Sequence, residues 1–415
     1  MRYPVFVLLC SAAAMLRGQD EVIQAAREGS PSLATLLPSS IAALNGPAKA
    51  GVLTNGQDFL FALNNDAAAD AAVSVDGMLR PLAKTGNYWY RLEKLNAGMT
   101  HKYQFFVGGK ALAPANDIGG YNPDSFARPG VPQGKLSEKM VITSKLYNGM
   151  KADYWIYASA GVDPAKPAPL MVWQDGAGMI NRNGGQRLLT VTDNLVAEKL
   201  IPPMVQVLIS PGISTDNKPL RSVQYDTVTD TYARFLMEEV LPEVEKHYKL
   251  RADGYSRAIG GASSGAICAF NVAWFMPEKF ARVHSTIGSY TSIQWRPDEK
   301  LEGGNVYPFK VRKEPKRNIR VWLSDGADDL ENNHGSWPLQ NIQMANSLKM
   351  REYDYHFRFG TAAHNGAQAT IDMPESLVWL WRGYDAAKTS ETFTMDPSEK
   401  DKPYYRVRIS NRDAW

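Results

Sequence analysis

Residues 257–275 read RAIGGASSGAICAFNVAWF. The pattern G-x-S-x-G, residues 261–265, lies between a short strand and a helical run that ends at Phe275, and this strand–turn–helix setting gives the pattern its meaning. In so tight a turn, side chains at Gly261 and Gly265 would collide with the neighbouring strand or helix. Ser263 then points its hydroxyl above the sheet, at the positive end of the following helix. The pattern predicts a nucleophilic Ser263; a plain glycine-rich turn is the alternative.

The residues around this turn indicate one α/β domain over residues 137–390. Amphipathic segments alternate with continuous apolar strands, and the longest segment, 227–248, contains Pro242 as a kink or break. Strands of this kind indicate a mostly parallel sheet covered by helices on both faces. An antiparallel hairpin with Asn148-Gly149 in its turn precedes them. The predicted strands are 140–147, 154–158, 170–173, 204–209, 257–259, 283–287 and 319–323.

A serine hydroxyl becomes a good nucleophile only when a base removes its proton and an acid orients that base. In the predicted fold the partners follow the serine in the order acid, then histidine. Of the six histidines, His364 occupies the loop between the last strand and the last helix, where this base is expected. His334 lies near carboxylates, but a metal site there needs more ligands than are evident, so no metal is predicted. Asp325, Asp328 and Asp329 all follow the strand 319–323, and their positions alone leave the acid open.

The first part of the chain has a different pattern of apolar and polar residues. Short alternating strands separated by turn residues over 51–111 predict an all-β sandwich. Residues 20–50 are expected to be a helical or irregular lead-in. Residues 112–136, rich in Pro, Gly, Asn and Asp, are expected to be a linker, and residues 391–415 a C-terminal tail.

Residues 1–19 resemble a secretory signal, because a basic start precedes a short apolar stretch and then polar sequence. Its removal would take away Cys10 and leave Cys268 as the remaining cysteine, so no internal disulfide is expected. We therefore expect a secreted or periplasmic protein. The 46 basic and 43 acidic residues are too evenly balanced for a nucleic-acid-binding protein. No apolar run has the roughly 18–20 residues that a membrane span requires.

Several segments of residues 51–384 resemble the esterases related to enterochelin esterase and feruloyl esterases. The family places an immunoglobulin-like early-set domain before an α/β-hydrolase domain. The resemblance implies that Asp329, which ends the loop GADD, is the acid and that His364 is the base. Ala266 departs from the second glycine common among relatives, and residues 367–372 lack the basic, glycine-rich character of the group. The matching segments are 172–176 (VWQDG), 232–239, 261–270, 335–338 (GSWP) and 379–382 (WLWR).

Together the residues and the resemblance imply a serine carboxylic-ester hydrolase that works through an acyl-enzyme and needs no cofactor. The oxyanion is expected to bind the N–H of Ser264 and that of Gly176 or Ala177. Arg221 and Trp337 are candidate substrate contacts, with a surface ion pair and a core aromatic as their respective alternatives.

The expected partner is a small-molecule or saccharide ester: a feruloyl or acetyl-carbohydrate ester, or a siderophore-type lactone. An acyltransferase with the same triad and a non-catalytic carbohydrate-binding protein are the alternative functions. The sequence does not predict the oligomeric state.

Overall fold

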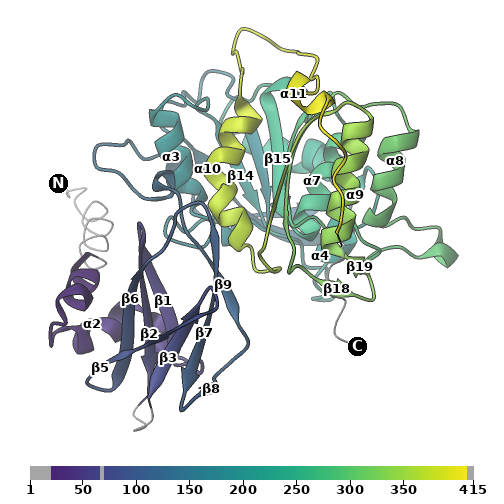
Figure 1. Ribbon diagram of the computed structural model, residues 1–415. Helices are drawn as coiled ribbons and strands as arrows, with labels where there is room; N and C mark the ends of the chain where they lie inside the picture. Colours follow the sequence, from purple (N-terminus) through teal and green to yellow (C-terminus); the bar gives the residue numbers. More distant parts are fainter. Residues whose placement is uncertain (1–19, 66–69, 409–415) are drawn as a thin grey trace, which may run out of the picture. The chain divides into compact units, whose positions relative to one another are not determined.

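The computed structural model describes residues 20–65 and 70–408 (Figure 1). The chain divides after Pro123 into two compact units, and each unit has its own hydrophobic clusters. The predicted signal segment, residues 1–19, lies outside the described residues. Within the described ranges, no helix has the length and apolar character needed to cross a membrane.

Two antiparallel sheets form the first unit. One has the order β1-β2-β6-β5; the other has the order β4-β3-β7-β8, with β9 also paired to β7. Phe59 and Phe61 of β2 share a buried cluster with Val73 of β3 and Phe105 of β7, so the two sheets enclose a common core. The strands are β1 (Ala50–Asn55), β2 (Asp58–Asn64), β3 (Ala71–Val75), β4 (Met78–Pro81), β5 (Ala83–Thr85), β6 (Tyr88–Lys94), β7 (Thr100–Val107), β8 (Lys110–Ala111) and β9 (Asn116–Gly119).

Helical segments before β1 cover the outer face of the first sheet. Residues 20–28 are helical, and α2 (Leu33–Ser40) and the 3-10 helix η1 (Ala42–Asn45) follow. Val22, Leu33 and Leu44 pack with Leu60 of β2. Because β2 is covered on both faces, its central residues are all buried rather than alternating.

Residues 112–136, predicted to be a linker, contain regular structure. β9 pairs with β7, and β10 (Lys135–Leu136) pairs with β12 of the second unit's sheet. Both strands are short and carry few apolar residues. The periodicity that reveals a strand is therefore missing from this part of the sequence.

A nine-stranded sheet runs through the second unit in the order β10-β12-β14-β13-β15-β16-β17-β20, with β11 paired to β12. β10, β11 and β12 are antiparallel to their neighbours, and every later pairing is parallel. The predicted mostly parallel sheet with a leading hairpin is thus present. Its further strands are β11 (Met140–Ser144), β12 (Met150–Ala158), β13 (Leu170–Gln174), β14 (Val205–Ile209), β15 (Arg257–Ala262), β16 (Arg282–Thr286), β17 (Arg320–Gly326) and β20 (Asp354–Gly360).

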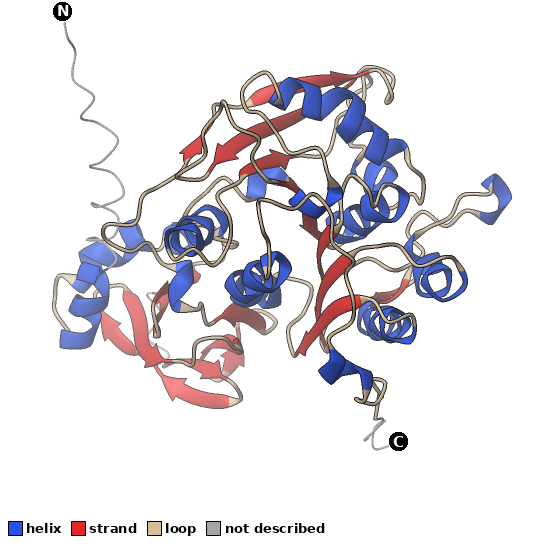
Figure 2. Ribbon diagram, turned by 90° about the horizontal axis from the view of Figure 1, so that it is seen from above, coloured by secondary structure: helices blue, strands red, loops and turns tan. Residues whose placement is uncertain are grey.

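Helices cover both faces of this sheet, as the view from above shows (Figure 2). On one face, α3 (Leu188–Ala197) and α10 (Ala367–Trp381) pack against Met171 and Trp173 of β13. On the other, α7 (Ser264–Phe275), α8 (Tyr307–Lys313) and α9 (Trp337–Met350) share a larger cluster. The shorter elements are α4 (Arg221–Tyr225), the hairpin β18 (Glu331–Asn332) and β19 (Gly335–Ser336), and α11 (Pro397–Lys400).

The helix predicted over 227–248 is shorter and irregular. It consists of α5 (Thr231–Phe235), a π-helical turn (Leu236–Val240) and α6 (Leu241–Val244). Pro242, in the first turn of α6, has no N–H to donate to the carbonyl four residues before it. The wider turn directly before Pro242 accommodates this loss, and the helical path continues.

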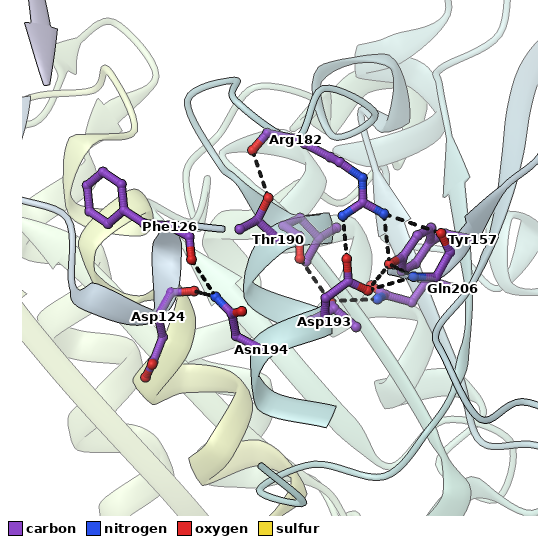
Figure 3. A network of polar contacts seen from close by, with 11 residues as sticks. Asp124, Phe126, Tyr157, Arg182, Thr190, Asp193, Asn194 and Gln206 are labelled. Atoms are coloured by element: carbon purple, nitrogen blue, oxygen red, sulfur yellow. Dashed lines mark hydrogen bonds and ion pairs between the residues drawn. The ribbon is translucent and has the colours of Figure 1, made fainter. Parts of the chain in front are cut away.

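A buried polar network fastens the start of the second unit to α3 (Figure 3). Asn194 donates to the carbonyls of Asp124 and Phe126 at 2.7 and 2.8 Å. The preceding residue, Asp193, accepts from the N–H of Gly134 at 2.9 Å, from the hydroxyl of Tyr157 and from the guanidinium of Arg182. The chain that leads into β10 is therefore held by side chains of one helix.

Candidate active site

Ser263 stands at the sharp turn between β15 and α7. Its backbone has φ 58° and ψ −122°, a conformation that costs a non-glycine residue on the order of 1–3 kcal/mol. Two hydrogen bonds hold it: the Ser263 N–H donates to Thr286 at 3.0 Å, and the Ser263 carbonyl accepts from Ser289 at 3.2 Å. The end of β16 and the loop after it therefore fix the strained turn.

Close backbone packing explains the two glycines of the turn. A Cβ at Gly261 would lie 2.6 Å from the carbonyl carbon of Gly265, and one at Gly265 would lie 2.9 Å from the Cβ of Gln174. The predicted collisions with the helix and the neighbouring strand are thus confirmed. Ser263 itself is partly exposed, whereas Ser264 is buried.

The loops after β17 and β20 come close together because of Gly326. A Cβ at this last residue of β17 would lie 2.1 Å from the carbonyl oxygen of Ala362. The N–H of Ala327 also donates to Gly360, the last residue of β20, at 3.0 Å. The first loop carries Asp329 and the second carries His364, so this contact places the two side chains beside each other.

Ser263, His364 and Asp329 form a continuous hydrogen-bonded chain. His364 Nε2 lies 2.8 Å from Ser263 Oγ, and His364 Nδ1 lies 2.5 Å from Asp329 Oδ1. The imidazole is 19% exposed and the Asp329 side chain is fully buried. A hydroxyl, an imidazole and a carboxylate in this order can pass the hydroxyl proton to the imidazole and stabilise the resulting positive charge.

The three carboxylates after β17 occupy different environments. Asp328 is exposed, Asp325 is fully buried, and Asp329 contacts His364. Burial by itself would raise the pKa of Asp329, but hydrogen bonds from His364 and its other neighbours hold that pKa below the ordinary value. Among the three, Asp329 has the geometry for orienting the imidazole.

Trp337, predicted as a possible substrate contact, is instead part of the core. Its residue is 2% exposed, its indole N–H donates to Ser289 Oγ at 3.2 Å, and its ring meets that of His364 edge-on at 5.6 Å. Ser289 Oγ in turn lies 3.2 Å from Ser263 Oγ. Trp337 therefore supports the serine and the histidine from behind, and a buried ring leaves no face for a substrate to stack on.

Arg221, a candidate substrate contact with a surface ion pair as the alternative, pairs with Asp175. Its Nε and Nη2 donate to the two carboxylate oxygens of Asp175, each at 2.8 Å. Asp175 has a left-handed backbone with φ 57°, directly before the 3-10 helix η3 (Gly176–Gly178). The two parallel hydrogen bonds hold this loop in place, which is the ion-pair alternative for Arg221.

The predicted oxyanion donors come from two segments, the start of α7 and the loop after β13. Ser264 is the first residue of α7. The N–H of Ala177 donates to Ser210 Oγ at 3.2 Å, so it is engaged within the loop. A Cβ at Gly176 would lie 2.2 Å from the carbonyl carbon of Leu208. Gly176 is thus required for packing against β14.

The sequence analysis did not identify Ser289, which lies in the loop after β16. It contacts Ser263 through its hydroxyl, and its N–H donates to the Ser263 carbonyl. Neither a motif nor a period marks this serine, so its position after the strand next to β15 is the available signal. Within the described ranges, no cluster of three or more His, Cys, Asp or Glu side chains could hold a metal ion.

The family model described as "Putative esterase" matches residues 151–373, which include Ser263, Asp329 and His364. A bifunctional "Endo-1,4-beta-xylanase/feruloyl esterase" of Xylanibacter ruminicola is 27% identical over 145 residues, 35% of this chain. The chain spans 17% of the length of that relative.

Solved structures show a similar fold. The enterobactin esterase FES from Shigella flexneri has a TM-score of 0.56 and 17% identity, covering 80% of this chain and 96% of that one. The ferric enterobactin esterase of Salmonella typhimurium has a TM-score of 0.53 and 15% identity, covering 82% and 98%. At these identities the likeness concerns the fold, whereas the family model matches more than half of the chain. The chain therefore belongs to the esterase family whose model it matches.

Proposed function

We propose that the protein hydrolyses carboxylic esters through a covalent acyl-enzyme on Ser263. The observation that carries the proposal is the line of short contacts from Ser263 Oγ through His364 to Asp329, at 2.8 and 2.5 Å. Family membership supports the reaction class. The strained backbone of Ser263 supports the role of this residue, because such strain is retained where function requires it.

In the proposed mechanism, His364 removes the proton of Ser263 as its oxygen attacks the ester carbonyl. Asp329 holds the imidazole with Nδ1–H toward the carboxylate and stabilises its positive charge. His364 then protonates the leaving alcohol, which departs and leaves the acyl group on Ser263. Water, activated by the same imidazole, attacks the acyl-enzyme and releases the acid.

The tetrahedral intermediates need preorganised hydrogen-bond donors, and removal of one donor typically costs about 100- to 1,000-fold in rate. We assign this role to the backbone N–H of Ser264, at the positive end of α7, and to that of Gly176. Ala177 fits less well, because its N–H already donates to Ser210. The Arg221–Asp175 pair holds the Gly176 loop beside the turn.

Three ester classes are the proposed substrates: feruloyl esters of carbohydrates, acetyl-carbohydrates and siderophore-type lactones. The name of the Xylanibacter relative includes feruloyl esterase, and the structural neighbours are enterobactin esterases. A comparison of kcat/KM on methyl ferulate, acetylated xylan and a cyclic catecholate lactone would choose among the three classes. The preferred substrate should exceed the others by at least tenfold, about 1.4 kcal/mol of transition-state binding.

Two further proposals concern the first part of the chain. The two facing antiparallel sheets support an immunoglobulin-like early-set domain. The composition of residues 1–19 supports export to the periplasm or the medium. Mass spectrometry of the mature protein from a secreting host would test the second proposal, and an intact Met1 would contradict it.

Substitution of the nucleophile tests the central proposal. Ser263→Ala should reduce hydrolysis of a p-nitrophenyl ester by at least 1,000-fold, because single removal of such a serine leaves only binding and oxyanion stabilisation. Its thermal unfolding should stay close to that of the wild type. Ser398→Ala, at an exposed serine of α11, is the control and should retain full activity. An active Ser263→Ala protein would refute the assignment.

A further inference from the structure

A second carboxyl group lies against the acid of the proposed triad. Asp325 belongs to β17 and is fully buried. Its Oδ1 accepts the N–H of Gly326 at 2.8 Å. Asp329 Oδ1 accepts from His364 and from the N–H of Leu330, both at 2.5 Å. The Oδ2 atoms of both carboxyl groups are buried, and neither has a donor among the described residues. Each carboxyl lies within hydrogen-bonding reach of the other.

Two carboxylates in contact inside a protein do not both ionise, because like charges there repel strongly and solvation is lost. One proton therefore lies between Asp325 and Asp329. Asp329 faces an imidazole that becomes positive during the reaction, so Asp329 is the better site for the negative charge. Burial raises the pKa of Asp325 well above its ordinary range, and the neighbouring Asp329 raises it further.

We propose that Asp325 is a positioning residue whose carboxyl stays protonated and donates a hydrogen bond to Asp329 Oδ2. This bond would leave Asp329 Oδ1 directed at His364 and would stop the carboxylate from rotating away. The inference rests on the proposed function, because it assigns to Asp325 a task within the triad.

The side-chain amide of Asn341, from α9, lies beside Asp325 and lowers its pKa, but burial and the neighbouring Asp329, which raise that pKa, have the larger effects. Its Nδ2 donates to the carbonyls of Gly288 and Trp337 at 2.9 and 3.0 Å. Asn341 Oδ1 is a competing neutral acceptor, but a hydrogen bond to the charged Asp329 is roughly twice as strong. β20 pairs the apolar Phe359 with Asp325. The titratable groups that face Asp325 are thus Asp329 and, through it, His364.

The contact between the two carboxyl groups implies that activity is lost at alkaline pH. When the pH rises far enough to remove the proton from Asp325, two buried negative charges oppose each other. Asp329 must then turn or move, and His364 loses its partner. An asparagine at position 325 keeps an N–H donor for Asp329 and has no proton to lose, so it should remove this alkaline loss.

The test compares three variants of the full chain on a p-nitrophenyl ester across the pH range. Asp325→Asn should retain kcat within about threefold at neutral pH, and its activity should persist to higher pH than that of the wild type. Asp325→Ala should lose about 10- to 100-fold in kcat with little change in KM, the scale expected for a misplaced catalytic group. Asp328→Asn, an exposed carboxylate of the same loop, is the matched control and should resemble the wild type at every pH.

A spectroscopic measurement makes the test independent of turnover. The proton on His364 Nδ1, in a hydrogen bond of 2.5 Å, should give a far-downfield NMR signal that is absent in His364→Ala. The signal should persist in Asp325→Asn and shift or disappear in Asp325→Ala. If Asp325→Ala does not fold, the pH profile and NMR signal of Asp325→Asn decide the question.

The two proposals fail in different ways. If Ser263→Ala remains active, the proposed function is wrong, whatever the Asp325 variants do. If the wild type depends on Ser263 but Asp325→Asn keeps the alkaline loss of the wild type, the role of Asp325 is wrong and the triad stands. Full activity in a folded Asp325→Ala protein would likewise contradict the role of Asp325 and leave the triad unaffected.

Discussion

Gly261 is the residue at which the catalytic turn tolerates least change. A Cβ there would lie 2.6 Å from backbone atoms of Gly265 and 3.0 Å from the Cβ of Gln174. Neither is the end of a flexible side chain, so α7 or β13 must shift. We expect Gly261→Ala to lower the free energy of unfolding by about 1–3 kcal/mol, as overpacking typically does. The shift of Ser263 should also reduce kcat by about 100-fold. Urea denaturation and steady-state kinetics measure the two effects.

A glycine of the adjacent loop provides the control for this prediction. A Cβ at Gly178 would meet no atom within 4 Å, so Gly178→Ala should unfold within about 1 kcal/mol of the wild type, since loss of unfolded-state freedom is the main effect. Equal urea midpoints for the two variants would show that crowding at Gly261 is unimportant.

At the scale of elements, the attachment of α3 depends on one carboxylate. Asp193 is nearly buried, and its carboxylate accepts hydrogen bonds from Arg182, Tyr157 and the N–H of Gly134. In Asp193→Ala all three donors lose this carboxylate, although the Gly134 N–H also donates to the Tyr157 hydroxyl at 3.1 Å and Arg182 also donates to the Gly134 carbonyl at 3.3 Å. Loss of one partner from a buried pair typically costs about 3–5 kcal/mol. Because Arg182 keeps 25% of its side chain exposed, we expect a loss at the lower end of that range. Urea denaturation measures the loss.

A surface pair at the end of the same helix offers the comparison. Glu198, at the C-cap of α3, pairs with Arg128, and the two side chains are 40% and 35% exposed. Glu198→Ala should cost at most about 1 kcal/mol, the usual value for an exposed pair. A loss from Asp193→Ala as small as this would mean that water replaces the missing carboxylate.

The elements also show which features a sequence can reveal. The turn at Ser263 was predictable because the collisions that demand Gly261 and Gly265 are local, and the apolar strands of the sheet were recognisable from composition. The sequence left two interpretations open for both Arg221 and Trp337, because their partners, Asp175 and Ser289, lie far away along the chain. No local pattern indicates which polar atom a long side chain will meet.

The acid of the site falls between these two cases. Position along the chain left Asp325, Asp328 and Asp329 equivalent, and the family resemblance implied Asp329. The structure separates them by burial and contact, which depend on how the loops after β17 and β20 approach each other at Gly326. Residue spacing alone likewise could not predict the contact between Asp325 and Asp329.

For the whole molecule, His284 links stability to pH. This imidazole is fully buried in β16, with Nε2 at 2.9 Å from Ser376 Oγ, and burial lowers its pKa from 6.5 to about 4. Below pH 6.5 the imidazole of His284 is protonated in the unfolded chain, whereas in the folded protein it stays neutral until about pH 4. The free energy of unfolding therefore decreases as the pH drops through this interval. The full loss from His284 amounts to roughly 3 kcal/mol.

The His284→Gln variant isolates this contribution. Burial raises the pKa values of Asp226 and Asp372 to about 6 and 7, and these groups change the stability in the opposite direction. The test therefore uses the difference in unfolding free energy between the wild type and the variant, in which their contributions cancel. The stability of the wild type relative to His284→Gln, from urea denaturation, should decrease between pH 6.5 and 4. His247→Gln, at an exposed position, should show little such decrease. A constant difference for His284→Gln would contradict the prediction.

The buried thiol of Cys268 has a practical consequence. It lies in α7, five residues after Ser263, and its accessible surface is 0%. A maleimide dye could reach it only after the helix separates from the sheet. With Cys10 replaced by serine, the labelling rate in native buffer would therefore report the spontaneous opening of α7, the helix that begins directly after Ser263. Stabilising ligands could then be ranked by how far they slow that labelling, without any chromogenic substrate.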